Sequence, residues 1–124
     1  MRTHYVLPIL VTSLLLALVA AACAAPKQVA PAAKSSEVQV VAREYSFEPA
    51  VIEVQVGRPF TLILENRGAL EHDIEVHGAN IHLHAEPGET VQGTFTITSP
   101  GTYEVTCEVP GHKELGMVGK LVAS

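Results

Sequence analysis

The stretch from Thr90 to Thr98, TVQGTFTIT, decides the fold class because its residues alternate in character. Threonine or glutamine occupies every even position, while Val91, Gly93, Phe95 and Ile97 occupy the odd positions. Alternation with a period of two places successive side chains on opposite faces of a β-strand. The stretch therefore predicts a strand with one buried face and one solvated face.

The same period recurs on both sides of this stretch. Residues 51–56 (VIEVQV), 60–64 (FTLIL) and 103–107 (YEVTC) each place alternate apolar side chains on one face. Clusters of Gly, Pro and Asn separate these segments, and no segment shows a sustained helical period. Short alternating strands with turns between them predict an all-β sandwich or barrel over residues 37–124.

Composition narrows the class of protein. The 124 residues carry 8 Lys and Arg against 13 Asp and Glu, which gives a formal net charge of −5. A nucleic-acid-binding protein ordinarily presents a basic patch, so this acidic balance argues against nucleic acid as a partner. The length allows one domain and little room for a large enzyme pocket. We therefore expect a small binding or carrier module and not an enzyme.

The N-terminus has the pattern of an export signal. Arg2 and His4 precede an uncharged, mostly apolar run over residues 6–22, which ends in small residues before Cys23. A basic start, an apolar stretch and a small-residue end are typical of a secretory signal. The sequence before Cys23 also resembles a bacterial lipoprotein cleavage site, in which Cys23 carries the lipid. Ala20 departs from that pattern, because Leu is usual there.

These features predict a signal peptide over residues 1–22, a flexible tether over residues 23–36 and the folded domain over residues 37–124. The tether is rich in small residues and Pro, and its thirteen residues after Cys23 reach about 40 Å when extended. Ordinary signal cleavage near Ala22 or Ala25 and an uncleaved anchor are the alternatives. We expect an exported protein of the cell envelope, in the periplasm or at the outer face of the cytoplasmic membrane.

One segment offers three metal-binding side chains. Residues 107–117, CEVPGHKELGM, place Cys107, His112 and Met117 between two predicted strands, and His72 supplies a second imidazole from an earlier strand. One thiolate, two imidazoles and a long axial thioether are the donors of a blue-copper electron-transfer site. Zinc is the alternative metal, but structural zinc sites use four Cys or His-type ligands and Met is not usual among them.

These motifs resemble those of a cupredoxin of the plastocyanin/azurin family over residues 37–124. The resemblance implies a Greek-key β-sandwich with one copper ion, His72, Cys107 and His112 as equatorial ligands, and Met117 as the axial ligand. The matching pieces are Asn66, His72-Asp-Ile74, Pro87-Gly-Glu-Thr90, Pro100-Gly-Thr-Tyr103, the Cys107–Met117 segment and Val118-Gly-Lys-Leu121.

The resemblance also implies a function and a route for electrons. Members of the family carry single electrons, and the exposed edge of the loop histidine, here His112, is the electron port. Asn66 and Asp73 are expected to brace the ligands, although Asp73 stands where the family often has Asn. The implied partners are redox proteins: a cytochrome, a quinol-oxidising complex, a terminal oxidase or a reductase. The apolar rim of the port is expected to comprise Leu70, Val109, Pro110 and Leu115.

Several alternatives stay open at this point. The function is otherwise copper storage, delivery or sensing, or docking to a larger complex with copper only stabilising the fold. Cys107 is otherwise a buried structural thiol or the disulfide partner of Cys23. His77 falls in a predicted turn, while His82 and His84 share one face of a strand. That pair either forms a solvated face or binds a second metal.

Overall fold

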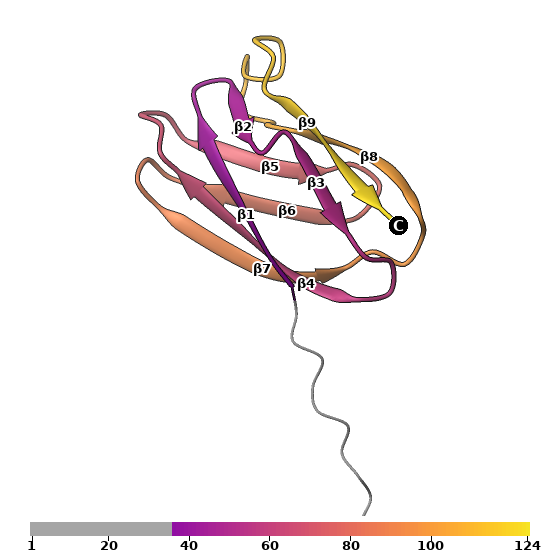
Figure 1. Cartoon of the computed structure of the whole chain (residues 1–124). Coiled ribbons are helices and arrows are strands. Elements are labelled where there is room, and N and C mark those ends of the chain that lie inside the picture. Colours follow the sequence, from indigo (N-terminus) through magenta and orange to yellow (C-terminus); the bar gives the residue numbers. More distant parts are fainter. Residues whose placement is uncertain (1–35) are drawn as a thin grey trace, which may run out of the picture. The chain divides into compact units, whose positions relative to one another are not determined.

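The computed structural model describes residues 36–124, which form nine β-strands (Figure 1). The predicted signal peptide, Cys23 and nearly all of the predicted tether lie outside the described residues. Within the described part, no helix is long and apolar enough to cross a membrane. The strands are β1 (Ser36–Arg43), β2 (Ser46–Glu48), β3 (Val51–Val54), β4 (Pro59–Asn66), β5 (His72–Val76), β6 (Ile81–Ala85), β7 (Thr90–Thr96), β8 (Gly101–Thr106) and β9 (Val118–Ala123).

The strands form two sheets, with the orders β2-β1-β4-β7 and β3-β9-β8-β5-β6. β1 pairs with β4 in parallel, and β3 pairs with β9 in parallel, while the other pairings are antiparallel. The chain therefore crosses from one sheet to the other several times between β2 and β8. This topology confirms the predicted all-β sandwich, whose core draws buried side chains from both sheets.

The stretch that predicted the fold class forms β7, with half-buried side chains at odd positions and exposed ones at even positions. Phe95 contacts Phe60 across the pair, with ring centroids 6.3 Å apart. The strand ends at Thr96, two residues before the end of the predicted segment, because its partner β4 begins opposite Thr96 at Pro59. Beyond that point the carbonyl of Ile97 accepts a hydrogen bond from Gly57 instead.

Two buried stripes change from apolar to polar at the same end of the sandwich. Along β4 the inward positions hold Phe60, Leu62 and Leu64 before the stripe ends on Asn66. Along β5 the inward stripe begins with His72. A connection of five residues joins these two positions in the chain. Because buried polar groups are costly without partners, this end of the sandwich is where a binding site is expected.

Candidate metal centre

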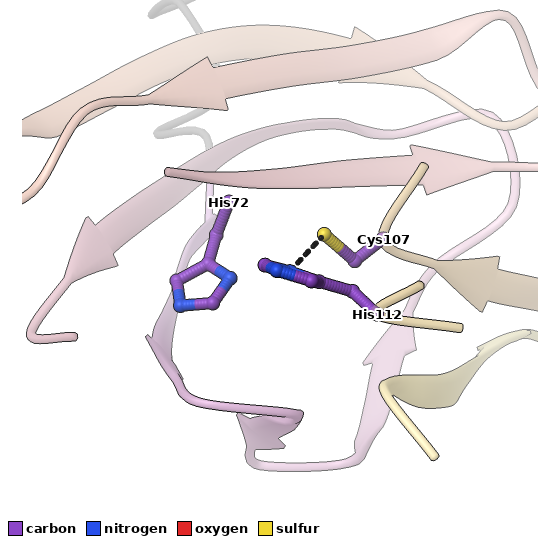
Figure 2. A group of neighbouring side chains, drawn as sticks. All are labelled: His72, Cys107 and His112. Atoms are coloured by element: carbon purple, nitrogen blue, oxygen red, sulfur yellow. Dashed lines mark hydrogen bonds between the residues drawn. The ribbon is translucent and has the colours of Figure 1, made fainter. Parts of the chain in front are cut away.

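A thiol and two imidazoles converge at this end of the sandwich (Figure 2). His72 is the first residue of β5, Cys107 directly follows β8, and His112 lies in the connection between β8 and β9. One ligand atom from each of the three residues lies within 4.8 Å of the others. The sulfur of Cys107 is 3.5 Å from Nδ1 of His112. The structure thus brings together three of the four predicted ligands as one buried donor group.

The connection between β8 and β9 is tied by its own main chain. The carbonyl of His112 accepts from the N–H of Met117, and the carbonyl of Met117 accepts from the N–H of Cys107. Gly111 and Gly116 adopt φ angles of 86° and 98°, which suit glycine because it has no Cβ. Met117 is fully buried. The predicted axial residue is therefore hydrogen-bonded through its main chain to two other predicted ligands.

The connection before His72 is held by Asn66, a buried residue at the end of β4. Its side-chain amide donates to the carbonyls of Leu70, at 2.7 Å, and Ala85, at 2.9 Å. Its Oδ1 accepts from the N–H of Gly68 at 2.9 Å. One side chain thereby ties the loop that leads into His72 to the end of β6. The hydrogen bonds of the Asn66 side chain restrain the loop that precedes His72.

Asp73 contacts the donor group through its main chain. Its N–H points at the sulfur of Cys107, with a separation of 3.3 Å between nitrogen and sulfur. Its carboxylate lies on the other face of β5 and contacts Nδ1 of His84 at 2.5 Å. Because the contact with sulfur uses the main chain, it is available to Asp and Asn alike. The departure from Asn at this position therefore leaves that hydrogen bond in place.

Three residues that the sequence reasoning missed also shape the site. The ring of Tyr45 meets that of His112 edge-on, with centroids 5.3 Å apart, and Tyr45 has a positive φ of 63°. Glu44 accepts a hydrogen bond from the N–H of Ala69. A Cβ on Gly68 would lie 2.7 Å from Oε1 of Glu44 and 2.8 Å from Nε2 of His72. The turn after β1 therefore contacts His112 through Tyr45. Gly68 lies next to His72, where a side chain would not fit.

Burial governs the charges in the site. Burial lowers the pKa of His72, and the neighbouring His112 lowers it further. Burial raises the pKa of the Cys107 thiol, against the opposing effect of the main-chain N–H groups of Asp73 and Val109. In the metal-free protein the thiol and the His72 ring are therefore favoured in their neutral forms. A metal ion must displace the proton of the thiol when it binds.

The donor group fits copper. Neither ring nitrogen of His72 has a hydrogen-bond partner, although both are buried. An unsatisfied buried polar group costs about 1–3 kcal/mol, which a bound metal ion would offset. Two imidazoles and one thiol, with a buried Met on the same loop as two of them, match the donors of a blue-copper site. Structural zinc sites favour a fourth Cys or His. One copper ion is the cofactor that these residues fit.

The predicted electron port and its predicted apolar rim differ in exposure. His112 is only 5% exposed. Leu70 lies on the connection before His72, Leu115 lies on the connection that carries His112, and both are exposed large apolar residues. Of the other predicted rim residues, Val109 is half-buried and Pro110 is exposed.

The other histidines among residues 36–124 lie outside this group. His77 follows β5, where its Nε2 is 2.6 Å from the hydroxyl of Thr106 and 3.4 Å from a carboxylate oxygen of Glu108. His82 and His84 both lie on the exposed face of β6. Asp73 and Glu86 raise the pKa of His84 by hydrogen bonding and charge.

Comparison with known proteins agrees with the fold. A sequence profile described as a cupredoxin-like domain matches residues 13–123. Auracyanin from Roseiflexus castenholzii superposes with a TM-score of 0.66 at 20% identity, over 73% of this chain and 98% of that protein. This likeness shows the fold and confirms the predicted cupredoxin-like sandwich.

The curated relatives include two proteins named copper-resistant cuproprotein CopI. The one from Pseudomonas aeruginosa is 25% identical over 77% of this chain and 79% of its own length. The one from Rubrivivax gelatinosus is 30% identical, and the match covers 58% of it. Cytochrome c oxidase subunit 2 from Thermus thermophilus is 30% identical, and the match spans about half of that relative, 51%.

Proposed function

Because the chain belongs to the cupredoxin-like domain family, we propose that it is an electron carrier whose His72, Cys107, His112 and Met117 hold one copper ion. Bound copper supplies the gain and loss of one electron between its Cu(II) and Cu(I) states. The observation that carries the proposal is the convergence of a buried thiol and two buried imidazoles, one of which has no other partner.

The chain's contribution is to hold its donors in one arrangement before the metal binds. Main-chain hydrogen bonds join Cys107 to Met117 and Met117 to His112, and Asn66 ties the loop that precedes His72. Donors held in this way have little freedom to move when the charge at the site changes by one. Small rearrangement favours rapid electron transfer, and the N–H of Asp73 at the sulfur is a means of setting the potential.

We propose that electrons enter and leave through the ring of His112. His112 retains a small exposed fraction and lies on the same connection as the exposed Leu115. Exposed apolar side chains beside such a ring favour brief contact with a partner's apolar surface. Tyr45, edge-on to the ring, joins this surface as a residue that limits how closely a partner approaches.

We propose redox proteins as partners: a cytochrome, a quinol-oxidising complex, a terminal oxidase or a reductase. The net charge of −5 favours a partner with a basic docking surface, and this steering weakens as salt rises. The similarity to a cytochrome c oxidase subunit supports an oxidase as one such partner.

Copper storage, delivery or sensing is the second candidate, and the similarity to two copper-resistant cuproproteins favours it. A delivery protein has to release its metal to a recipient. Here the three converging donors and Met117 are buried, with His112 the most exposed of the four at 5%. Burial of this degree hinders ligand exchange, so the geometry favours electron transfer.

We also propose that the protein is exported and acts in the cell envelope. The proposal rests on the sequence of residues 1–22 as a signal peptide, with Cys23 as the lipid attachment residue and residues 23–36 as the tether. Mass spectrometry of the protein from whole cells tests it. A mature chain that begins at a diacylglyceryl-modified Cys23 is expected, whereas an unmodified start elsewhere contradicts lipid attachment.

The function is tested by titrating the metal-free protein with Cu(II). We expect one equivalent of copper to produce an intense blue colour, which ascorbate bleaches and an oxidant restores. A Cu(I)-specific chelator present during this cycle should remove little copper. His72→Gln should lose the intense colour, while His77→Gln, which changes a histidine outside the donor group, should keep it.

Two results separate the candidates. A colourless complex that binds only Cu(I) and passes it promptly to the chelator contradicts electron transfer and supports delivery. A protein that takes up no copper contradicts both candidates.

A further inference from the structure

We infer that the exposed face of the β5–β6 hairpin carries a second metal site, formed by Glu71, His84 and Glu86 and specific for a divalent transition-metal ion. Ligand atoms of these three residues all lie within 4.8 Å of one another. They come from the connection before β5, from β6 and from the residue after β6. The register that pairs Asp73 with His84 places these segments side by side.

The two ring nitrogens of His84 have different surroundings, and this difference distinguishes the group from an ordinary cluster of surface charges. Nδ1 is 2.5 Å from Oδ1 of Asp73. Nε2 faces the two other carboxylates, at 3.7 Å from Glu71 and 3.5 Å from Glu86. A histidine that binds a metal commonly donates its other ring N–H to a carboxylate, which fixes the tautomer and the ring orientation. Asp73 is the positioning residue that does this for His84.

The separations between ligand atoms suit one ion. Zinc lies about 2.0–2.2 Å from nitrogen and oxygen ligands, so tetrahedral ligands are about 3.4 Å apart. The distances from Nε2 of His84 to the carboxylates of Glu71 and Glu86, 3.7 Å and 3.5 Å, are close to that value. Three protein ligands on an exposed face leave a fourth position open to water. The site therefore needs little movement of Glu71 and Glu86 to close around an ion.

Charge and donor type define the class of ion. With a neutral ring, the carboxylates of Asp73, Glu71 and Glu86 leave an excess of negative charge around His84, which favours a dication. An imidazole nitrogen suits zinc and copper, whereas magnesium and calcium prefer all-oxygen sites. His82, whose Nε2 is 3.7 Å from Oδ2 of Asp73, faces the positioning residue and adds no direct contact with the other two carboxylates.

The second site does not depend on the buried one. His84 lies on the outer face of the hairpin, whereas His72 lies on its inner, buried face. Its occupancy is therefore measured by differences between variants, whatever metal the buried group holds. Zn²⁺ is the probe, because it has no redox chemistry of its own.

The experiment measures Zn²⁺ binding to the purified protein by titration calorimetry and equilibrium dialysis. The wild-type protein is expected to bind one more Zn²⁺ than His84→Gln and than the double variant Glu71→Gln/Glu86→Gln. His77→Gln is the matched control, because its side chain is 41% exposed, as is that of His84. It should bind as much Zn²⁺ as the wild-type protein. Asp73→Asn should weaken binding about 10- to 100-fold without abolishing it.

A second readout locates the ion. In the ¹⁵N spectrum of the imidazole rings, Zn²⁺ should shift Nε2 of His84 far more than Nδ1, while the ring of His77 stays unchanged. Equal Zn²⁺ uptake by wild type and His84→Gln overturns the proposal. So does a loss in His77→Gln as large as that in His84→Gln, because uptake would then follow surface histidines in general. The substituted side chains are exposed, and a thermal melt of each variant confirms that it is folded.

Discussion

His72 and His84 lie on the same hairpin and have opposite environments. His72 is the first residue of β5 and lies fully buried on its inward face. Neither of its ring nitrogens has a hydrogen-bond partner, and burial lowers its pKa. His84 lies on the outward face of β6, directly opposite Asp73, and has a raised pKa. A strand pair alternates its faces with a period of two. The same hairpin therefore carries a buried, neutral histidine on its inner face. On its outer face it carries a histidine whose protonated form is stabilised by a carboxylate.

Substitution of Cys107 should have the largest effect on the inner site and almost none on the outer site. Cys107→Ser should abolish the intense blue colour of the copper-loaded protein, because the charge-transfer band needs the thiolate. The outward group should still bind Zn²⁺ with an affinity within about twofold of wild type, since none of its ligand atoms belongs to Cys107. Visible spectroscopy and calorimetry on the same preparation check both expectations. A variant that remains blue refutes Cys107 as a ligand.

Crowding the inner face should reduce stability. Gly68→Ala would place a Cβ 2.8 Å from Nε2 of His72 and 2.7 Å from Glu44. Overpacking of this kind lowers the free energy of unfolding by about 1–3 kcal/mol. Chemical denaturation of the metal-free protein measures the loss.

The double variant Glu44→Ala/Gly68→Ala identifies which neighbour resists the added methyl group. It removes the clash with Glu44 and keeps the clash with His72. Part of the destabilisation should therefore remain, relative to Glu44→Ala alone. Full recovery of stability in the double variant would show that the added methyl group does not press on the ring of His72.

The two faces of the strands could be predicted from the sequence, because apolar and polar residues alternate along it with a period of two. The alternation over residues 90–98 and its neighbours predicts the sandwich, and the spacing of Cys107, His112 and Met117 predicts the loop that carries three donors. His82 and His84 are two residues apart on a strand, which predicts their shared face. These features depend on local order along the chain.

The rest depends on contacts between segments that are distant in sequence. Nothing local marks Tyr45 as a neighbour of His112, and its positive φ has no signal in its residue type. Glu71 and Glu86 approach His84 because of the register between β5 and β6. A pattern of alternation does not determine register, since a shift by two residues preserves the same faces. The second metal group was therefore visible in the sequence only as a pair of histidines.

Substitution of the predicted axial ligand should change the midpoint potential of the copper site without abolishing its blue colour. Met117→Leu keeps a buried apolar side chain of similar volume but loses the thioether donor. We expect the blue colour to persist and the midpoint potential to rise, because an apolar neighbour disfavours the more highly charged Cu(II) state. A tenfold change in the relative affinity for the two states corresponds to about 59 mV for one electron. Voltammetry measures the shift, and an unchanged potential would indicate that Met117 only fills space.

The smallest effects are expected from substitutions on the outer face, which change the pKa of His84. The first cause of the raised pKa of His84 is its hydrogen bond to Asp73, and Glu86 adds a smaller contribution, with Glu71 also facing the ring. Asp73→Asn should therefore lower the pKa of His84 more than Glu86→Gln does, as measured by NMR titration in the presence of a chelator.

A raised pKa in the folded state means that the native protein binds the proton more tightly than the unfolded chain. The resulting stability is fully present below the ordinary pKa of histidine, about 6.5, and is lost as pH rises through the raised pKa of His84. Because the pair is partly exposed, this contribution is below about 1 kcal/mol. The difference in unfolding free energy between wild type and Asp73→Asn should shrink over that pH range. A difference that grows with pH would contradict the assignment of the proton to this pair.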